Sequence, residues 1–115
     1  MSFLADGVLM ASAVTPQLVE LLETAGPFGA AAQAPRFAVA DQQVTVRRMG
    51  EHHLRVQFGA GLEAVLFNAF DSPLGVALEQ AGHRRFHLAG RLEINTWGGR
   101  SRVQMRLEDA AYAIG

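Results

Sequence analysis

Hydrophobic residues follow a helical spacing near the start of the chain. In the segment TPQLVELLETAG, residues 15–26, apolar side chains recur three or four positions apart at Leu18, Leu21, Leu22 and Ala25. Thr15 suits the capping position before a helix, Pro16 suits its first turn, and Gly26 suits its end. The pattern predicts a helix over about residues 15–25, with those four side chains on its buried face.

A stretch containing proline and glycine follows this helix. The segment PFGAAAQAP, residues 27–35, combines helix-breaking residues with alanines that offer little surface for packing. It predicts a linker. We therefore expect an N-terminal segment over residues 1–35, made of the helix and the linker, and a second domain over residues 36–115.

From residue 36 onward, apolar and polar residues alternate, which is the pattern of a strand with one buried face. RFAVADQQVTVRR predicts an extended or bent first strand, and HLRVQF predicts a second strand with Leu54, Val56 and Phe58 facing inward. LEAVLFN is nearly all apolar and predicts a third strand with both faces covered. FHLAGRLEIN and RVQMRLED predict the fourth and fifth strands.

One helix interrupts this series of strands. The segment DSPLGVALEQAG, residues 71–82, offers Asp71 or Ser72 as a cap, Pro73 in the first turn and Gly82 at the end. A mainly β chain of five short strands, with a helix between strands 3 and 4, has the layout of the OB-fold, a five-stranded Greek-key β-barrel. An open α+β sheet is the alternative.

The composition narrows the functional classes. The chain has 115 residues, 50% of them hydrophobic, and no cysteine, so disulfides and thiolate metal sites are excluded. No apolar run is long enough to span a membrane, and we expect a cytoplasmic protein. The net charge is only −1, yet all ten basic residues are arginine. Because arginine grips phosphate with two donors, a nucleic-acid partner is compatible with this composition.

The residues indicate no hydrolytic site. Glu51-His52-His53 resembles a metal-binding cluster, but adjacent histidines on a strand point to opposite faces and cannot easily share one ion. None of the four serines lies in the strand-to-helix turn of a catalytic nucleophile. The sequence therefore predicts a polar turn around residues 51–53, and neither catalytic nor metal-binding residues.

Two motifs resemble those of a known family. The first comprises Pro27, Phe28, Gly29, Pro35 and Phe37. The second lies in the last predicted hairpin and comprises Asn95, Trp97, Gly99, Arg100 and the run Leu107-Glu108-Asp109. In this order they resemble the C-terminal OB domain of RecJ-type exonucleases, over about residues 6–109. Ala31-Ala32-Gln33 departs from the Gly-Asn-Pro that is usual in that family.

The resemblance implies a function that the residues alone do not give. RecJ-type exonucleases degrade single-stranded DNA from the 5′ end in DNA repair and recombination, with Mn or Mg ions in a catalytic Asp-His-His domain. That domain is missing from this sequence. The resemblance thus implies a fragment, with Met1 and Ser2 added at its start, that holds no cofactor and cleaves no DNA by itself. Its expected partners are single-stranded DNA and the missing catalytic domains.

The predicted DNA site follows from how OB-folds bind oligomers. They use the face of strands 2 and 3, between the loops that join strands 1–2 and 4–5. The residues expected to contact the DNA are Arg47, Arg48, His52, His53, Arg55, Gln57, Asn95, Trp97 and Arg100. The arginines would follow the phosphates. Trp97 would stack on a base or, alternatively, cap the barrel core.

Other residues receive structural interpretations. Three further arginines are expected to pair across strands with acids such as Glu93 and Glu108, namely Arg91, Arg102 and Arg106. Phe67 is expected in the core. The alternative function for the whole chain is a protein–protein or interdomain scaffold without nucleic-acid contact. A weaker alternative is a stand-alone OB protein that binds RNA or oligosaccharide.

Overall fold

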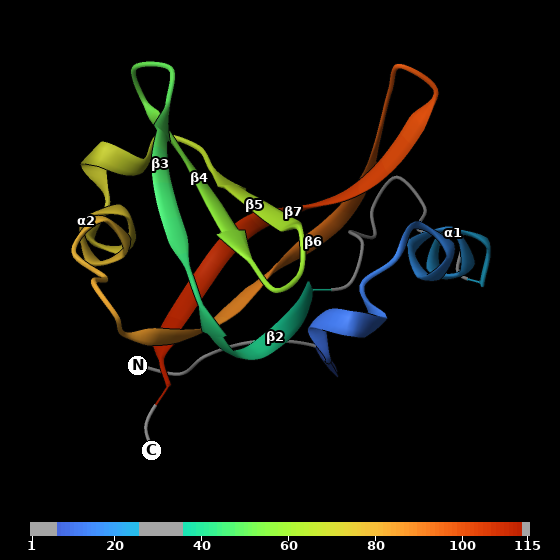
Figure 1. The fold of residues 1–115 in the computed structure, drawn as a ribbon, viewed down its shortest axis with the longest axis horizontal. Coiled ribbons are helices and arrows are strands. Elements are labelled where there is room, and N and C mark those ends of the chain that lie inside the picture. The colour runs from blue at the N-terminus through green and yellow to red at the C-terminus, as the bar shows by residue number, and fades with distance from the viewer. Residues whose placement is uncertain (1–6, 26–35, 114–115) are drawn as a thin grey trace.

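The chain folds mainly as one β-sheet with two α-helices beside it (Figure 1). The computed structural model describes residues 7–25 and 36–113, without the side chains of residues 22–25 and of Trp97. The strands are β1 (Gly7–Leu9), β2 (Arg36–Gln43), β3 (Thr45–Met49), β4 (His53–Phe58), β5 (Leu62–Leu66), β6 (Arg85–Trp97) and β7 (Arg100–Tyr112). The helices are α1 (Pro16–Ala25) and α2 (Pro73–Glu79), with the 3₁₀ turns η1 (Ala11–Ala13) and η2 (Ala69–Asp71).

The sheet closes on itself through one continuous stretch of chain. Its strand order is β1-β2-β6-β7-β5-β4-β3, so β2 and β3 lie toward opposite ends of the order. Only Val44 separates them in sequence. The sheet must therefore curl until these two ends meet (Figure 1). Within the curled part, β5 and β7 pair in parallel, and the other neighbouring strands are antiparallel.

A β-bulge bends the chain where the sheet closes. The pairing of β2 with β6 shifts register between Val39 and Gln42, and Asp41 adopts a left-handed φ of 55°. Three hydrogen bonds hold Asp41 in this conformation, and in one of them Arg85 Nη2 donates to the Asp41 carbonyl oxygen at 2.7 Å. Arg85 Nε donates to Asp41 Oδ1 at 2.7 Å, and the Asp41 backbone N–H donates to His87 Nδ1 at 3.0 Å. Bulges of this kind bend strands and increase their twist.

The bend changes the strand count that the sequence predicts. The single first strand is divided at Val44 into β2 and β3, and β1 is an additional strand paired in parallel with β2. Seven strands therefore replace the predicted five. The apolar positions change from odd to even numbers between Val39 and Val44, which indicates a bend but does not by itself divide the segment into two strands.

The pattern of apolar and polar residues correctly predicts which side chains of β4 and β5 are buried. In β4, Leu54, Val56 and Phe58 are buried, whereas Arg55 and Gln57 are exposed, as predicted. In β5, Ala64 and Leu66 pack in the core. Val65 on the opposite face is only 2% exposed. Both faces of this strand are therefore covered, as its apolar sequence predicts.

The first helix occupies the predicted range but buries a different face. Thr15 Oγ1 accepts a hydrogen bond from the Leu18 N–H at 3.2 Å. Leu21, predicted to be buried, is 64% exposed, whereas Val19 is 2% exposed. Apolar residues lie on more than one side of the segment LVELL, so docking against β6 and β7 selects the buried side. The side chains of Leu22 and Ala25, and Gly26, lie outside the described residues.

The second helix begins where the sequence predicts and ends earlier. The Ser72 hydroxyl accepts from the Gly75 N–H at 3.0 Å, so Ser72 rather than Asp71 is the cap. The helix ends at Glu79, three residues before Gly82, which has a φ of 57°. Its buried residue Leu78 joins the core. The chain passes from β5 through this helix to β6.

The N-terminal part of the chain packs into the same core as the strands. Val14 and Val19 belong to the main cluster of buried residues, and β1 aligns Gly7 with Phe37 of β2. The predicted linker, residues 27–35, lies outside the described residues. The division into residues 1–35 and 36–115 stays a prediction.

We predict that Gly90→Ala destabilises the fold, because a Cβ at this position would overlap the backbone carbonyl oxygen of Arg106 on the neighbouring strand. Overpacking of this kind costs about 1–3 kcal/mol. Gly7→Ala is the matched control, since its Cβ would meet only the edge of the Phe37 ring, at 3.3 Å. Urea unfolding measures both free energies. Equal free energies of unfolding for the two variants would contradict the prediction.

Candidate nucleic-acid interface

The predicted site residues near the first hairpin lie mostly on strands. Arg47 and Arg48 belong to β3, not to the loop where the sequence placed them, and His53 opens β4. Only His52 lies in the connection between these strands. The strands extend further because Arg48 and Met49 continue the pairing, opposite Leu54 and His53. The connection is therefore a short turn, and the arginines have fixed positions on the sheet.

The predicted residues at the last hairpin also lie on strands. Asn95 and Trp97 end β6, Arg100 begins β7, and the turn consists of Gly98 and Gly99 alone. Their φ angles are 58° and 77°, which fits a two-residue turn with both central residues left-handed. The Trp97 backbone pairs with Arg100. Its side chain lies outside the described residues, so its role stays a prediction.

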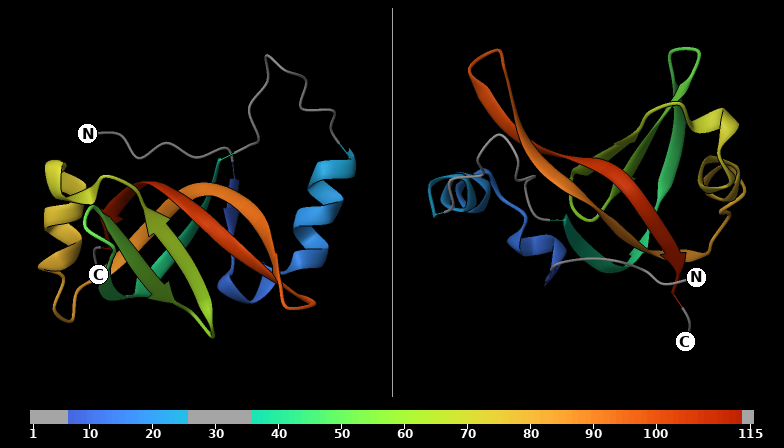
Figure 2. Two further views of the ribbon diagram at one scale, coloured as in Figure 1. Left: turned by 90° about the horizontal axis from the view of Figure 1, so that it is seen from above. Right: turned by 180° about the vertical axis from the view of Figure 1, so that it is seen from behind.

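A cleft of about 1060 Å³ separates the β6–β7 hairpin from the β4–β5 turn. Among the predicted site residues, it brings together Gln57, Asn95 and Arg100. Arg102 and Gln104 also line it. Five other predicted residues do not line it, namely Arg47, Arg48, His52, His53 and Arg55. The β3–β4 and β6–β7 hairpins nevertheless project from the same side of the sheet (Figures 1 and 2).

Strand register arranges five arginines in one row across the sheet. From β3 to β2, consecutive cross-strand partners are Arg47, Arg55, Val65, Arg106, Arg91 and Arg36. We call this set the arginine row. Like charges directly opposite each other on neighbouring strands are destabilising. The row therefore requires nearby carboxylates.

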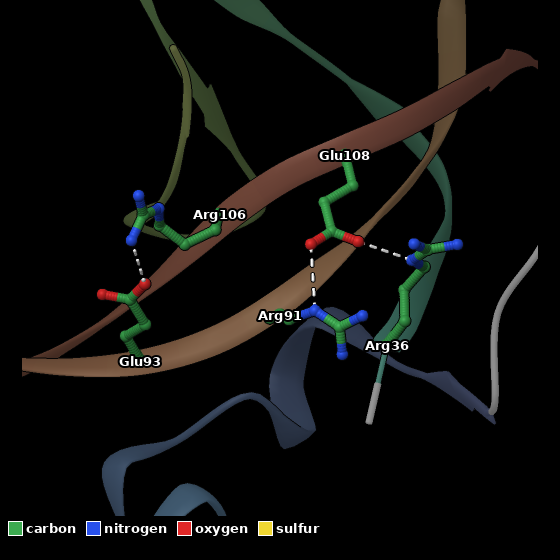
Figure 3. Close-up of polar contacts among 5 residues, drawn as sticks. All are labelled: Arg36, Arg91, Glu93, Arg106 and Glu108. Atoms are coloured by element: carbon green, nitrogen blue, oxygen red, sulfur yellow. Dashed lines mark hydrogen bonds and ion pairs between the residues drawn. The ribbon is translucent and has the colours of Figure 1, made fainter. Parts of the chain in front are cut away.

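Carboxylates neutralise four members of the arginine row. Glu108 binds two of them, with Oε1 at 2.6 Å from Arg36 Nε and Oε2 at 3.0 Å from Arg91 Nε (Figure 3). Glu93 Oε1 lies 3.1 Å from Arg106 Nη1, and Glu63 Oε1 lies 3.1 Å from Arg55 Nε. The predicted pairing of Arg91 and Arg106 with these acids is confirmed.

A second bulge gives Glu108 its central position. The pairing of β6 with β7 shifts between Ala89 and Gly90, so Glu108 is the extra residue between Leu107 and Asp109. Bulges re-aim the side chains that they carry. Glu108 consequently reaches arginines on two strands, and its side chain is 29% exposed.

Arg48, although predicted to contact DNA, is engaged by the second helix. Its Nε lies 2.9 Å from Glu79 Oε2, and its guanidinium carbon lies 4.7 Å from the centroid of the Phe70 ring. The side chain is still 69% exposed. Its charge is thus partly compensated, like that of Arg55.

Four arginines lack a carboxylate partner among the described residues, and one of them, Arg84, lies over the Tyr112 ring at 3.7 Å from its centroid. Within residues 7–25 and 36–113, no ion pair or hydrogen bond engages the side chain of Arg47, Arg100 or Arg102. The prediction that Arg102 pairs with an acid is wrong, because its cross-strand partner is Asn95. Arg100 and Arg102 both line the cleft, which therefore carries two unpaired positive charges.

Phe67 is exposed, contrary to the prediction that it lies in the core. Its exposed fraction is 42%. Because Leu66 faces the core, the next residue faces outward, and Asn68 then turns the chain with a φ of 53°. The alternation of inward and outward side chains along β5 was the sequence signal that could have identified Phe67 as exposed. His53 lies beside it, with the ring centroids 4.9 Å apart and the rings edge to face.

The histidines do not form a metal site in the described part of the chain. His52 is 70% exposed, and its Nε2 lies 3.9 Å from Glu51 Oε2. His53 Nδ1 accepts a hydrogen bond from the Asn68 N–H at 3.1 Å. No group of three or more His, Cys, Asp or Glu residues close enough to hold an ion occurs among the described residues. In the same ranges, no helix is long and apolar enough to cross a membrane.

The sequence motifs and the curled sheet are those of an OB domain. The chain belongs to the RecJ OB domain family, whose model matches residues 5–109. This confirms the resemblance seen in the sequence.

Curated relatives carry the description single-stranded-DNA-specific exonuclease RecJ. The protein of Dickeya dadantii (strain 3937) is 32% identical over 109 residues, or 90% of this chain. The Salmonella typhimurium (strain LT2) protein is 30% identical over 92% of the chain, and the Escherichia coli (strain K12) protein is 31% identical over 91%. The chain spans 18% of the length of each.

We predict that Glu108→Gln lowers the free energy of unfolding by about 1 kcal/mol, because two partly sheltered arginines lose their charged partner. The Arg91 and Arg36 side chains are 25% and 28% exposed. Glu51→Gln is the control, since Glu51 is 92% exposed. Urea unfolding at low and at high salt measures both. No difference between the variants at low salt would refute the stabilising role of Glu108.

Proposed function

We propose that this chain is the single-stranded-DNA-binding OB domain of a RecJ-type 5′→3′ exonuclease. It holds the strand for a catalytic domain elsewhere in that enzyme, which acts in DNA repair and recombination in the cytoplasm. The family and the description of the relatives as single-stranded-DNA-specific exonucleases support this proposal.

The arrangement of the strands supports an oligomer-binding barrel. If β2 and β3 are counted as one bent strand and β1 is left aside, the five remaining strands have the layout of a Greek-key barrel, with α2 between the third and the fourth. β4 and β5 are then the second and third strands, whose outer face binds oligomers in OB-folds. The β3–β4 and β6–β7 hairpins, on the same side of the sheet, would border the bound strand (Figure 2).

The unpaired arginines are the observation that carries this proposal. Arg47, Arg100 and Arg102 lack carboxylate partners among the described residues, and two of them line the cleft. A guanidinium that is already paired must give up its carboxylate to bind a phosphate, whereas an unpaired one does not. These three residues therefore supply the phosphate contacts, and the polar side chains Gln57 and Asn95 lie near the bases.

Cleavage belongs to another part of the parent enzyme. Hydrolysis of a phosphodiester by two metal ions requires clustered carboxylates around the metals. The described residues offer no such cluster, so their donor set does not fit the Mn or Mg ions that the family implies. In this proposal the chain binds and positions the strand, and the ions act in the catalytic domain.

The second candidate function is docking to another domain or protein through the edge strand β1. Val8 of the edge strand β1 is 70% exposed, and Met10, directly after this strand, is 76% exposed. Apolar side chains on an edge strand favour contact with another domain or protein. This interdomain scaffold function would leave single-stranded DNA unbound.

We predict that Arg100→Ala and Arg102→Ala each reduce the salt dependence of binding to single-stranded DNA. Each lost phosphate contact lowers the slope of log K against log salt by about 0.7. Arg84→Ala is the matched control, because Arg84 also lacks a carboxylate partner among the described residues but does not line the cleft. Fluorescence anisotropy with a labelled oligonucleotide over a series of salt concentrations gives the slopes. Identical slopes for all three variants would favour the scaffold function.

We predict that Trp97→Ala weakens binding by ~1–3 kcal/mol and leaves the salt slope unchanged, because stacking on a base releases no counterions. Trp97→Phe, which keeps an aromatic ring, should lose less. The same anisotropy series and a thermal melt provide the measurements. A sharp fall in melting temperature with unchanged affinity would instead assign the indole to capping the core.

A further inference from the structure

A second, smaller pocket lies on the outer face of the barrel, away from the cleft. Its volume is about 290 Å³, and its walls include Phe67, Arg91, Glu93, Arg106, Leu107 and Glu108. Pockets for small molecules begin at about 300 Å³. This pocket is at the lower limit of that range, so it suits a small group such as a single base.

The Phe67 ring is held in place on the wall of this pocket. The guanidinium carbon of Arg106 lies 4.6 Å from its centroid, and the His53 ring meets it edge to face at 4.9 Å. Arg106 is in turn fixed by Glu93, and His53 by the Asn68 N–H. Although the ring is 42% exposed, these contacts restrict its rotamers. Arg106 covers one face of the ring, so a ligand can stack only on the other face, where it would cost little additional side-chain entropy.

The charges of the pocket favour a neutral ligand. Two arginines and two glutamates line it, so its formal charge is zero. Both carboxylate oxygens of Glu108 are engaged, whereas Glu93 pairs through Oε1 alone (Figure 3). The second oxygen of Glu93 is thus available as an acceptor at the pocket. A phosphate would gain no net attraction there, because both arginines already pair with carboxylates, but the exocyclic amino group of a base would be a suitable donor.

The pocket and the cleft lie along the same strand. Gln104 of β7 lines the cleft, and Arg106, two residues further along β7, lines the pocket. Residues two apart on a strand share a face. A strand whose phosphates contact Arg100 and Arg102 could therefore continue along β7 to Phe67.

We propose that this pocket accepts one unstacked nucleobase of the bound strand, with Phe67 as the stacking platform and Glu93 as the acceptor for an exocyclic amino group. The proposal rests on the proposed DNA-binding function and adds a base preference to it. Cytosine, which carries an amino group, is preferred over thymine, which carries none.

Binding of oligo-dC and oligo-dT of equal length to the full chain tests the pocket. The unmodified chain should bind oligo-dC several-fold more tightly than oligo-dT. Phe67→Ala and Phe67→Leu should weaken oligo-dC binding by about tenfold and remove the preference, which corresponds to ~1.4 kcal/mol for one lost stacking contact. Phe67→Tyr, which keeps the ring, should retain both affinity and preference.

The outcomes separate this proposal from the proposed function. If Arg100→Ala weakens binding while Phe67→Leu and Phe67→Tyr both bind like the unmodified chain, the pocket takes no base and only the DNA-binding function stands. If the unmodified chain binds neither oligonucleotide at low salt, both fail. Melting temperatures identify any variant that does not fold, and the Leu and Tyr variants, which preserve apolar packing, then decide the result.

Discussion

Closure of the sheet at the bend between β2 and β3 is the constraint on which the rest of the structure depends. Because one stretch of chain serves both ends of the sheet, every barrel strand has an inner face in a common core and an outer face available for contacts. The bend itself depends on Asp41, whose left-handed backbone is tied to Arg85 and His87. The same closure aligns arginines from different strands in one row.

Electrostatics on the outer face follow from this alignment. A row of directly opposed guanidinium groups is tolerable only when carboxylates lie between them, and Glu108 satisfies two at once because a bulge directs it there. The arginines therefore form two groups. Those of the first pair with carboxylates and stabilise the barrel, and those of the second lack a carboxylate partner among the described residues and can bind a ligand. Position on the sheet, and not residue type, decides to which group an arginine belongs.

Short-range patterns in the sequence predicted the parts of the fold that short-range forces decide. The alternation in β4, and a cap at Asp71 or Ser72 that proved to be Ser72, were read from neighbouring residues alone. The burial of Val19 depends on the distant strands β6 and β7, against which its helix packs. The pairing of Arg102 with Asn95, by contrast, follows from the two-residue turn at Gly98 and Gly99, so the sequence did contain the signal that Arg102 faces no acid. Phe67 lies between these cases. The alternation along β5 indicated that its side chain points outward, but the prediction placed it in the core because it is apolar.

The parallel pairing of β5 with β7, and the antiparallel pairing of β2 with β6, join segments that are far apart in the chain. The β3–β4–β5 meander, by contrast, joins neighbours. Proteins dominated by distant pairings fold slowly, because the entropy of closing long loops is lost before the contacts form. The meander can consequently form early, whereas the barrel closes only once the chain beyond Arg85 is present and paired. During synthesis, exposed strand edges would persist until the last hairpin emerges.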